Sequence, residues 1–178
     1  MKSGHLRLCG LLFLTLLSGC ATTSPTVVIR GKDGAKIRLT APSGWHIAEK
    51  GPSADCEHAI LMAPNQKEKS AEPEITVDYF DRTAPGNNRQ DSLARTYLLT
   101  IRSQTDEKVS MEKAGFTNTP AGTVSIYRFH SSYYGEHLAA FLPFEHGHAL
   151  VELWTTKREL MDRSRPAFEQ VCKSVTLK

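Results

Sequence analysis

The sequence lacks the motifs that identify the common enzyme classes. It has no Gly-x-Ser-x-Gly motif of a serine hydrolase, no His-Glu-x-x-His zinc motif and no glycine-rich loop that could hold a phosphate. It also has no block of Lys and Arg residues that could grip nucleic acid. We therefore expect a protein that is not an enzyme, uses no cofactor and binds no nucleic acid.

Long hydrophobic runs are also absent, because no apolar stretch reaches the roughly 20 residues that a membrane-spanning helix needs. The apolar run at residues 11–17 ends at a Ser-Gly pair, and Lys2 and Arg7 precede it. A basic start, a short apolar stretch and small residues before a cleavage point are typical of a secretory signal. The alternatives are an uncleaved transmembrane helix and a plain secretory signal followed by a chance cysteine.

Residues 17–20 read Leu-Ser-Gly-Cys, and this ending resembles the lipobox of bacterial lipoproteins. The resemblance implies a signal peptide over residues 1–19 and a lipid anchor on Cys20, with palmitate as the expected acyl group. Residues 20–25 then form a short polar tether to the membrane. Ala21 follows the cysteine, which in a Gram-negative host resembles sorting to the outer membrane. We expect a lipid-anchored protein of the cell envelope, in such a host at the outer membrane facing the periplasm.

Removal of residues 1–19 leaves 159 of the 178 residues, a length typical of one domain. We place this single domain at residues 26–178. Two of the 22 basic residues, Lys2 and Arg7, leave with the signal, and no acidic residue does. The mature chain therefore has a net charge of +1, which gives no general attraction to acidic partners.

Cysteines are few: Cys9 leaves with the signal and Cys20 is acylated, so Cys56 and Cys172 remain. Two thiols in an exported protein predict a disulfide. This bridge would close a loop of 116 residues, which the chain-entropy model values at about 4–5 kcal/mol. The alternatives are two free buried thiols and a redox pair. No residues with metal-ligand spacing flank either cysteine.

Alternating apolar residues and short glycine-containing links predict an antiparallel sheet, with helices at residues 91–104 and 157–173. Asp91 is the expected N-cap of the first helix, and Pro166 is expected to kink or divide the second. The fold class is therefore α+β: an antiparallel β-sheet with a meander, packed against two main helices, both expected on one side of the sheet. The expected strands are residues 26–30, 36–40, a piece that begins at Trp45, 58–62, 74–80, 109–116, 123–131, 136–144, 148–155 and 175–177.

Over residues 35–178 the chain resembles PsbP-like domains and related small bacterial lipoproteins. The resemblance rests on residues 41–45 (Ala-Pro-Ser-Gly-Trp), the helix at Asp91, the hairpin with Gly147, and a closing segment from Phe168 to Val175. It implies a noncatalytic binding or assembly module.

Histidines gather in the predicted meander, at residues 146–148 (His-Gly-His), His130 and His137. Two imidazoles at i and i+2 on one strand face can chelate zinc or copper, with Glu136 and Glu145 nearby as further ligands. Gly147, between His146 and His148, is expected to make the turn, so the imidazoles of these two histidines would lie on opposite sides of the bend. We therefore expect exposed turn histidines and no metal site.

Two further pairs are candidates for a site. Asp78 and Asp81 stand at the end of a predicted strand, where alternation makes them solvent-facing. Tyr133 and Tyr134 form a loop tip that either contacts a partner or packs against the domain. The preferred function is a membrane-anchored binding or assembly module with an envelope protein partner. The alternatives are a metal-dependent or hydrolytic envelope enzyme and a carrier of a small apolar ligand.

The lipobox gives the first testable prediction. The protein expressed in a Gram-negative host should partition into detergent, and Cys20→Ser should not, because the acyl chains supply the affinity for the detergent phase. Phase partition and intact mass measure this. A Cys20→Ser protein that still partitions, together with a parent protein without added lipid mass, would contradict lipidation.

Overall fold

The computed structural model describes residues 24–31, 34–52, 57–64, 72–80, 89–105, 108–132, 135–145 and 147–178. Several residues singled out from the sequence lie outside this part of the chain, so the predictions about them stay predictions. They are Cys9, Cys20, Cys56, Asp81, Tyr133, Tyr134 and His146.

Within these residues the chain forms ten strands and two helices, which confirms the α+β class. The elements are β1 (Thr26–Arg30), β2 (Lys36–Thr40), β3 (His46–Pro52), β4 (Glu57–Met62), β5 (Glu74–Phe80), α1 (Gln90–Thr105), β6 (Ser110–Thr119), β7 (Gly122–Ser131), β8 (Gly135–Pro143), β9 (His148–Thr155), α2 (Arg158–Ser174) and β10 (Thr176–Leu177). Neither described helix is long and apolar enough to cross a membrane.

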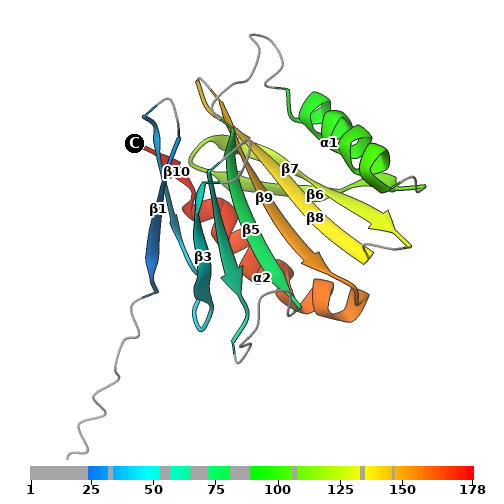
Figure 1. Cartoon of the computed structure of the whole chain (residues 1–178), viewed down its shortest axis with the longest axis horizontal. Helices are drawn as coiled ribbons and strands as arrows, with labels where there is room; N and C mark the ends of the chain where they lie inside the picture. The colour runs from blue at the N-terminus through cyan, green and yellow to red at the C-terminus, as the bar shows by residue number, and fades with distance from the viewer. Residues whose placement is uncertain are drawn as a thin grey trace, which may run out of the picture.

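The strands form two antiparallel sheets (Figure 1). The larger sheet has seven strands in the order β3-β4-β5-β9-β8-β7-β6, and the smaller one has the order β1-β2-β10. The predicted meander is present as β7-β8-β9, and β6 extends it to the edge of the sheet. The last strand of the meander, β9, lies at the centre of the large sheet because it pairs with both β8 and β5.

One face of the large sheet packs against α2 and the small sheet. Along β9, Val151 and Leu153 point to this face, where Phe168 and Val171 of α2 pack against them in one buried cluster. The small sheet adds Leu39 and its neighbours to the same cluster. Figure 1 shows α2 behind the large sheet and the small sheet beside β3.

The other face packs against α1, over β7 and β8. Ala94 and Ile101 of the helix are buried there with Phe129, Phe141 and Leu150 of the sheet. The two helices therefore lie on opposite faces, and the expectation that both lie on one side was wrong. The physical reason is visible in β8, where five consecutive residues from Leu138 to Leu142 are buried, so that both faces of the strand need a cover.

Pro166 does not divide the second helix, because α2 runs without a break from Arg158 to Ser174. A proline in a helix interior removes one hydrogen bond and costs about 3 kcal/mol. Met161, Phe168 and Val171 are all fully buried on the sheet side of the same helix. Full burial of such side chains gives about 1.5–3 kcal/mol each, so packing on both sides of Pro166 outweighs the cost.

Cys172 is the cysteine that the structure describes, and its side chain is fully buried in α2 without a bridge to any described residue. Burial raises the pKa of Cys172 well above the usual value of a thiol, so this group would be protonated and unreactive if it stayed unbridged. A bridge to Cys56 would draw that residue into the core beside α2.

The predicted Cys56–Cys172 disulfide can be tested by counting thiols. The mature protein, denatured without a reductant, should show no reactive thiol because both cysteines are bridged. The same sample after reduction should show two, which controls for access of the reagent. Two reactive thiols before reduction would contradict the bridge and support two free cysteines.

Candidate functional site

Among the hollows formed by the described residues, two of similar size lie on opposite faces of the large sheet. The first, the polar cleft, lies on the α2 face and has a volume of about 330 Å³. The second, the α1 cavity, lies between α1 and the sheet and has a volume of about 320 Å³. Both are near the lower end of ligand pockets, which span roughly 300–1,000 Å³.

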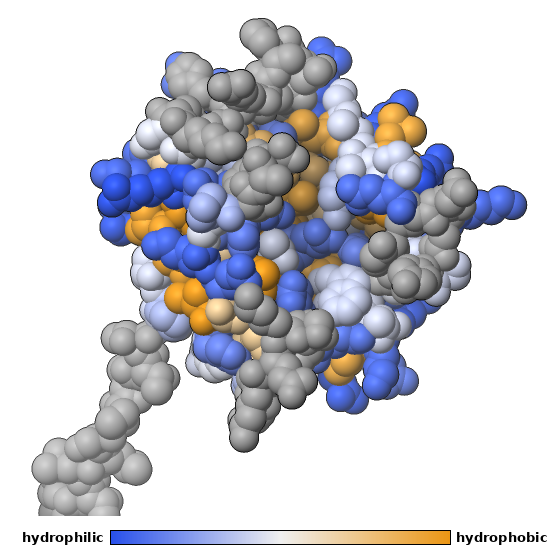
Figure 2. All heavy atoms as spheres, in the orientation of Figure 1, coloured by the Kyte–Doolittle hydropathy of each residue, from blue (hydrophilic) through white to orange (hydrophobic). Residues whose placement is uncertain are grey.

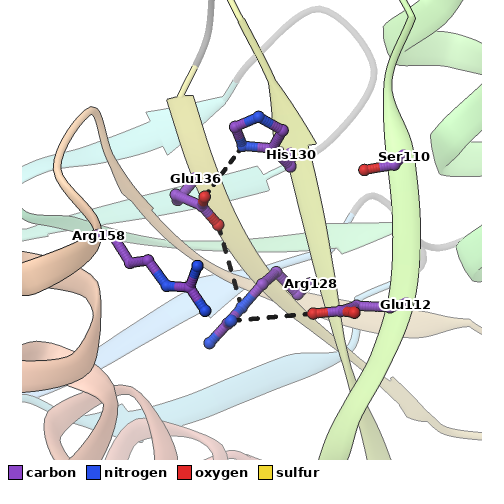
Figure 3. Close-up of a pocket in the computed structure, with 6 residues that line it drawn as sticks. All are labelled: Ser110, Glu112, Arg128, His130, Glu136 and Arg158. Atoms are coloured by element: carbon purple, nitrogen blue, oxygen red, sulfur yellow. Dashed lines mark hydrogen bonds and ion pairs between the residues drawn. The ribbon is translucent and has the colours of Figure 1, made fainter.

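Arg128 of β7 stands at the centre of the polar cleft (Figure 3). Its guanidinium lies 3.8 Å from a carboxylate oxygen of Glu112, 4.0 Å from Glu136 and 3.8 Å from Asp162. Arg158, at the start of α2, reaches toward the same point. The charges of the polar cleft are therefore largely matched within the protein itself.

The predicted histidine cluster is only partly assembled in this cleft. His130 and Glu136 lie on paired strands, with Nδ1 of His130 2.9 Å from Oε1 of Glu136. His137 faces the opposite side of the sheet, where its Nδ1 contacts Glu152. No group of three or more His, Cys, Asp or Glu residues in the described part of the chain is placed to hold a metal ion.

The α1 cavity has a different chemistry, because its walls are mostly apolar and aromatic. Figure 2 shows apolar side chains in a hollow beside α1. The described residues that line it are Asp78, Phe80, Leu93, Thr96, Tyr97, Thr100, Phe141, His148, Leu150 and Glu152. Apolar walls with a few convergent polar groups are the usual composition of a small-molecule site.

Tyr97 connects the middle of α1 to β9 at the base of the cavity. Its hydroxyl donates a hydrogen bond of 2.6 Å to Oε1 of Glu152, and the same carboxylate oxygen contacts Nδ1 of His137. Burial raises the pKa of Tyr97 well above its usual value, and the negative charges of Glu152 and Asp78 act in the same direction. Tyr97 is therefore a neutral donor at any physiological pH.

The ends of α1 are also held by polar contacts, with the sheet at the helix start and with the segment before β6 at the helix end. At the helix start, Asp91 accepts a hydrogen bond from the hydroxyl of Tyr127; burial and this bond raise the pKa of Tyr127 to about 12. Asp91 lies within the first turn, and the helix begins at Gln90, so its predicted N-cap role was wrong. At the helix end, Nη2 of Arg102 donates to the carbonyl of Val109 at 2.7 Å. These contacts set the position of α1 above the sheet.

His148 is a half-buried wall of the α1 cavity, so the prediction of an exposed turn histidine was wrong for this residue. Its ring stacks on Phe80, with centroids 5.0 Å apart and an interplanar angle of 16°. Gly147 does lie in the connection before β9, and a Cβ there would come within 2.3 Å of the carbonyl oxygen of Phe80. That close approach brings His148 against β5. Burial lowers the pKa of His148 to about 4, so the ring is neutral at pH 7.

Sequence reasoning placed Asp78 in solvent and did not single out Phe80 or Glu152. Asp78 is half-buried and lines the cavity. The alternation of side chains along a strand does indicate which of these residues share a face. Positions 78 and 80 share one face of β5, and positions 148, 150 and 152 share one face of β9. The sequence did not show that the two strands are neighbours.

Comparison with known proteins shows a likeness in fold. The solution structure of cyanobacterial PsbP (CyanoP) from Synechocystis matches 98% of this chain and 100% of its own chain, with a TM-score of 0.59 and 16% sequence identity. No family model matches the sequence. No curated protein matches it either. The predicted PsbP-like fold is thus confirmed, and at this identity the likeness concerns the fold alone.

The half-buried position of His148 predicts a pH-dependent stability. In the unfolded chain this histidine takes up a proton near pH 6.5, whereas in the folded protein its pKa is about 4. Between these pH values the unfolded state binds more protons than the folded state. The contribution of neutral His148 to the free energy of unfolding is therefore complete above pH 6.5 and is lost as the pH falls toward 4. We expect this loss to lower the free energy of unfolding by about 2 kcal/mol from pH 7 to pH 5.

His148→Phe keeps the stacked ring and removes the proton site, so the variant should lose correspondingly less stability over this range. Urea denaturation at pH 7 and pH 5 measures the difference. His46→Gln changes an exposed histidine of β3 and should behave as the parent protein does. Equal losses in the parent protein and His148→Phe would contradict the assigned proton site.

Proposed function

We propose that the mature protein is a lipid-anchored, non-catalytic binding protein of the cell envelope, and that the α1 cavity is its binding site. The observation that carries the proposal is the apolar cavity held open between α1 and the sheet. Its aromatic and aliphatic walls offer burial to the apolar part of a ligand, and its few polar groups can orient that ligand.

The titratable groups of the cavity favour binding over catalysis. Glu152 already accepts a hydrogen bond from Tyr97 and contacts His137, and His148 is stacked on Phe80. A general base must reach the proton of a bound substrate, and a nucleophile needs such a base beside it. Side chains engaged in this way serve as walls and orienting groups.

The anchor and the location are part of the same proposal. The lipobox-like ending at Cys20 and the tether at residues 20–25 support attachment to a membrane close to the domain. Ala21 supports the outer membrane of a Gram-negative host. An envelope protein partner is also proposed, and the edge strand β6 favours it, because Phe116 on that strand is 70% exposed.

A cavity-filling variant tests the binding site. Leu93 lines the cavity, and Leu99 lies on the same helix with a side chain that is 64% exposed. Titration with 1-hexanol, followed by amide NMR, should give saturable shifts around Phe141 and Leu150 in the parent protein. Leu93→Trp should abolish these shifts because the larger side chain fills the cavity, and Leu99→Trp should retain them.

Saturable binding that survives Leu93→Trp would contradict the α1 cavity as the site. The circular dichroism of both variants should match that of the parent protein, so that a loss of binding reports filling and not unfolding. A hydrolytic turnover of the purified protein that is abolished by Leu93→Trp and kept by Leu99→Trp would replace the binding function with the enzyme alternative.

A further inference from the structure

The Asp and Glu side chains among the described lining residues give the α1 cavity a negative character. Asp78 and Glu152 both line it, and none of the described lining residues is Lys or Arg. The strand pairing makes the carboxylates diagonal neighbours, since Asp78 faces Leu150 and Glu152 faces Thr76 on the adjacent strand. Diagonal side chains on neighbouring strands lie close enough for long groups to interact, so both carboxylates act on the same small volume.

This negative character extends over the neighbouring part of the sheet. The α1-side positions of β4, β5, β8 and β9 include three acidic residues and no Lys or Arg. In register order they are His58, Ile60 and Met62; Glu74, Thr76, Asp78 and Phe80; His137, Ala139, Phe141 and Pro143; and His148, Leu150, Glu152 and Trp154. The raised pKa of Tyr97 is consistent with this field, because Glu152 and Asp78 both contribute to it.

The aromatic walls complement the carboxylates. Tyr97 and Phe141 meet edge to face with ring centroids 5.9 Å apart, and His148 stacks on Phe80. Aromatic faces attract cations, and the attraction is stronger when the cation is partly desolvated. His148 is neutral at pH 7, so it adds a further ring and no competing positive charge.

We propose that the α1 cavity selects a small organic cation: an ammonium group held near Asp78 and Glu152, on an apolar body that packs between α1 and the sheet. The volume of about 320 Å³ limits the ligand to a small molecule. This inference rests on the proposed function, because it specifies the ligand class of the same cavity. An anionic ligand of the same length would meet two carboxylates in an apolar surrounding and would be rejected.

Three ligands of equal chain length separate the charge preference from the apolar contribution. Hexylammonium, 1-hexanol and hexanoate are titrated separately at pH 7 and followed by amide NMR. We expect hexylammonium to bind about tenfold more tightly than hexanol, a ratio within the range of cation–π and carboxylate contacts, and hexanoate about tenfold more weakly. Asp78→Asn, which keeps the side-chain shape, should reduce the preference for hexylammonium over hexanol to about threefold or less.

Glu112→Gln is the matched control, since it removes one carboxylate from the polar cleft on the opposite face. It should leave all three affinities unchanged. An equal loss of preference in Glu112→Gln and Asp78→Asn would overturn the inference, because the preference would then reflect the overall charge of the protein. Hexanol binding with no preference for hexylammonium would overturn the inference and leave the proposed function standing. No saturable binding of any of the three ligands would overturn both.

Discussion

Strand β8 of the large sheet is apolar on both faces, and the covering layers of the sheet follow from this. In β8, every residue from Leu138 to Leu142 is buried. A single covering layer would leave half of these side chains in water, at about 25 cal/mol for each Å² of apolar surface. The chain meets the requirement with α2 and the small sheet on one face and α1 on the other.

The layers that pack on the two faces of the large sheet differ in the area that they cover, and the α1 cavity results from that difference. α2 and the small sheet together bury most of one face, from Val124 on β7 to Ala59 on β4. α1 lies over β7 and β8 and is held there by polar contacts at its two ends and by Tyr97 in its middle. One side of α1 therefore lies next to half-buried residues of β5 and β9, and the helix, these two strands and their aromatic residues form the walls of the cavity.

Local features of the fold could be predicted from the sequence, and long-range ones could not. The ends of β1, β2, β5 and β9 were predicted to the residue, because alternation and turn residues are encoded in neighbouring positions. The pairing of β9 with β5 joins segments about 75 residues apart and has no local signal. For the same reason the sequence did not show that Asp78 and Glu152 share a cavity, or that His148 stacks on Phe80. The sequence did not show that α2 continues through Pro166, because the cost of a proline is local and the packing that outweighs this cost is tertiary.

The small sheet places Lys178 at the opposite end of the sheet from Thr26, the first residue of β1. β10 pairs with the beginning of β2, and Lys178 exchanges backbone hydrogen bonds with Lys36, whereas Thr26 pairs with Thr40 at the other end. A strand of five residues is about 17 Å long, so the carboxyl end emerges on the far side of the small sheet from residue 26 (Figure 1). A fluorophore or affinity tag joined after Lys178 would therefore lie at the opposite end of the small sheet from Thr26, and it would remain accessible if the protein were held at the Thr26 end of this sheet.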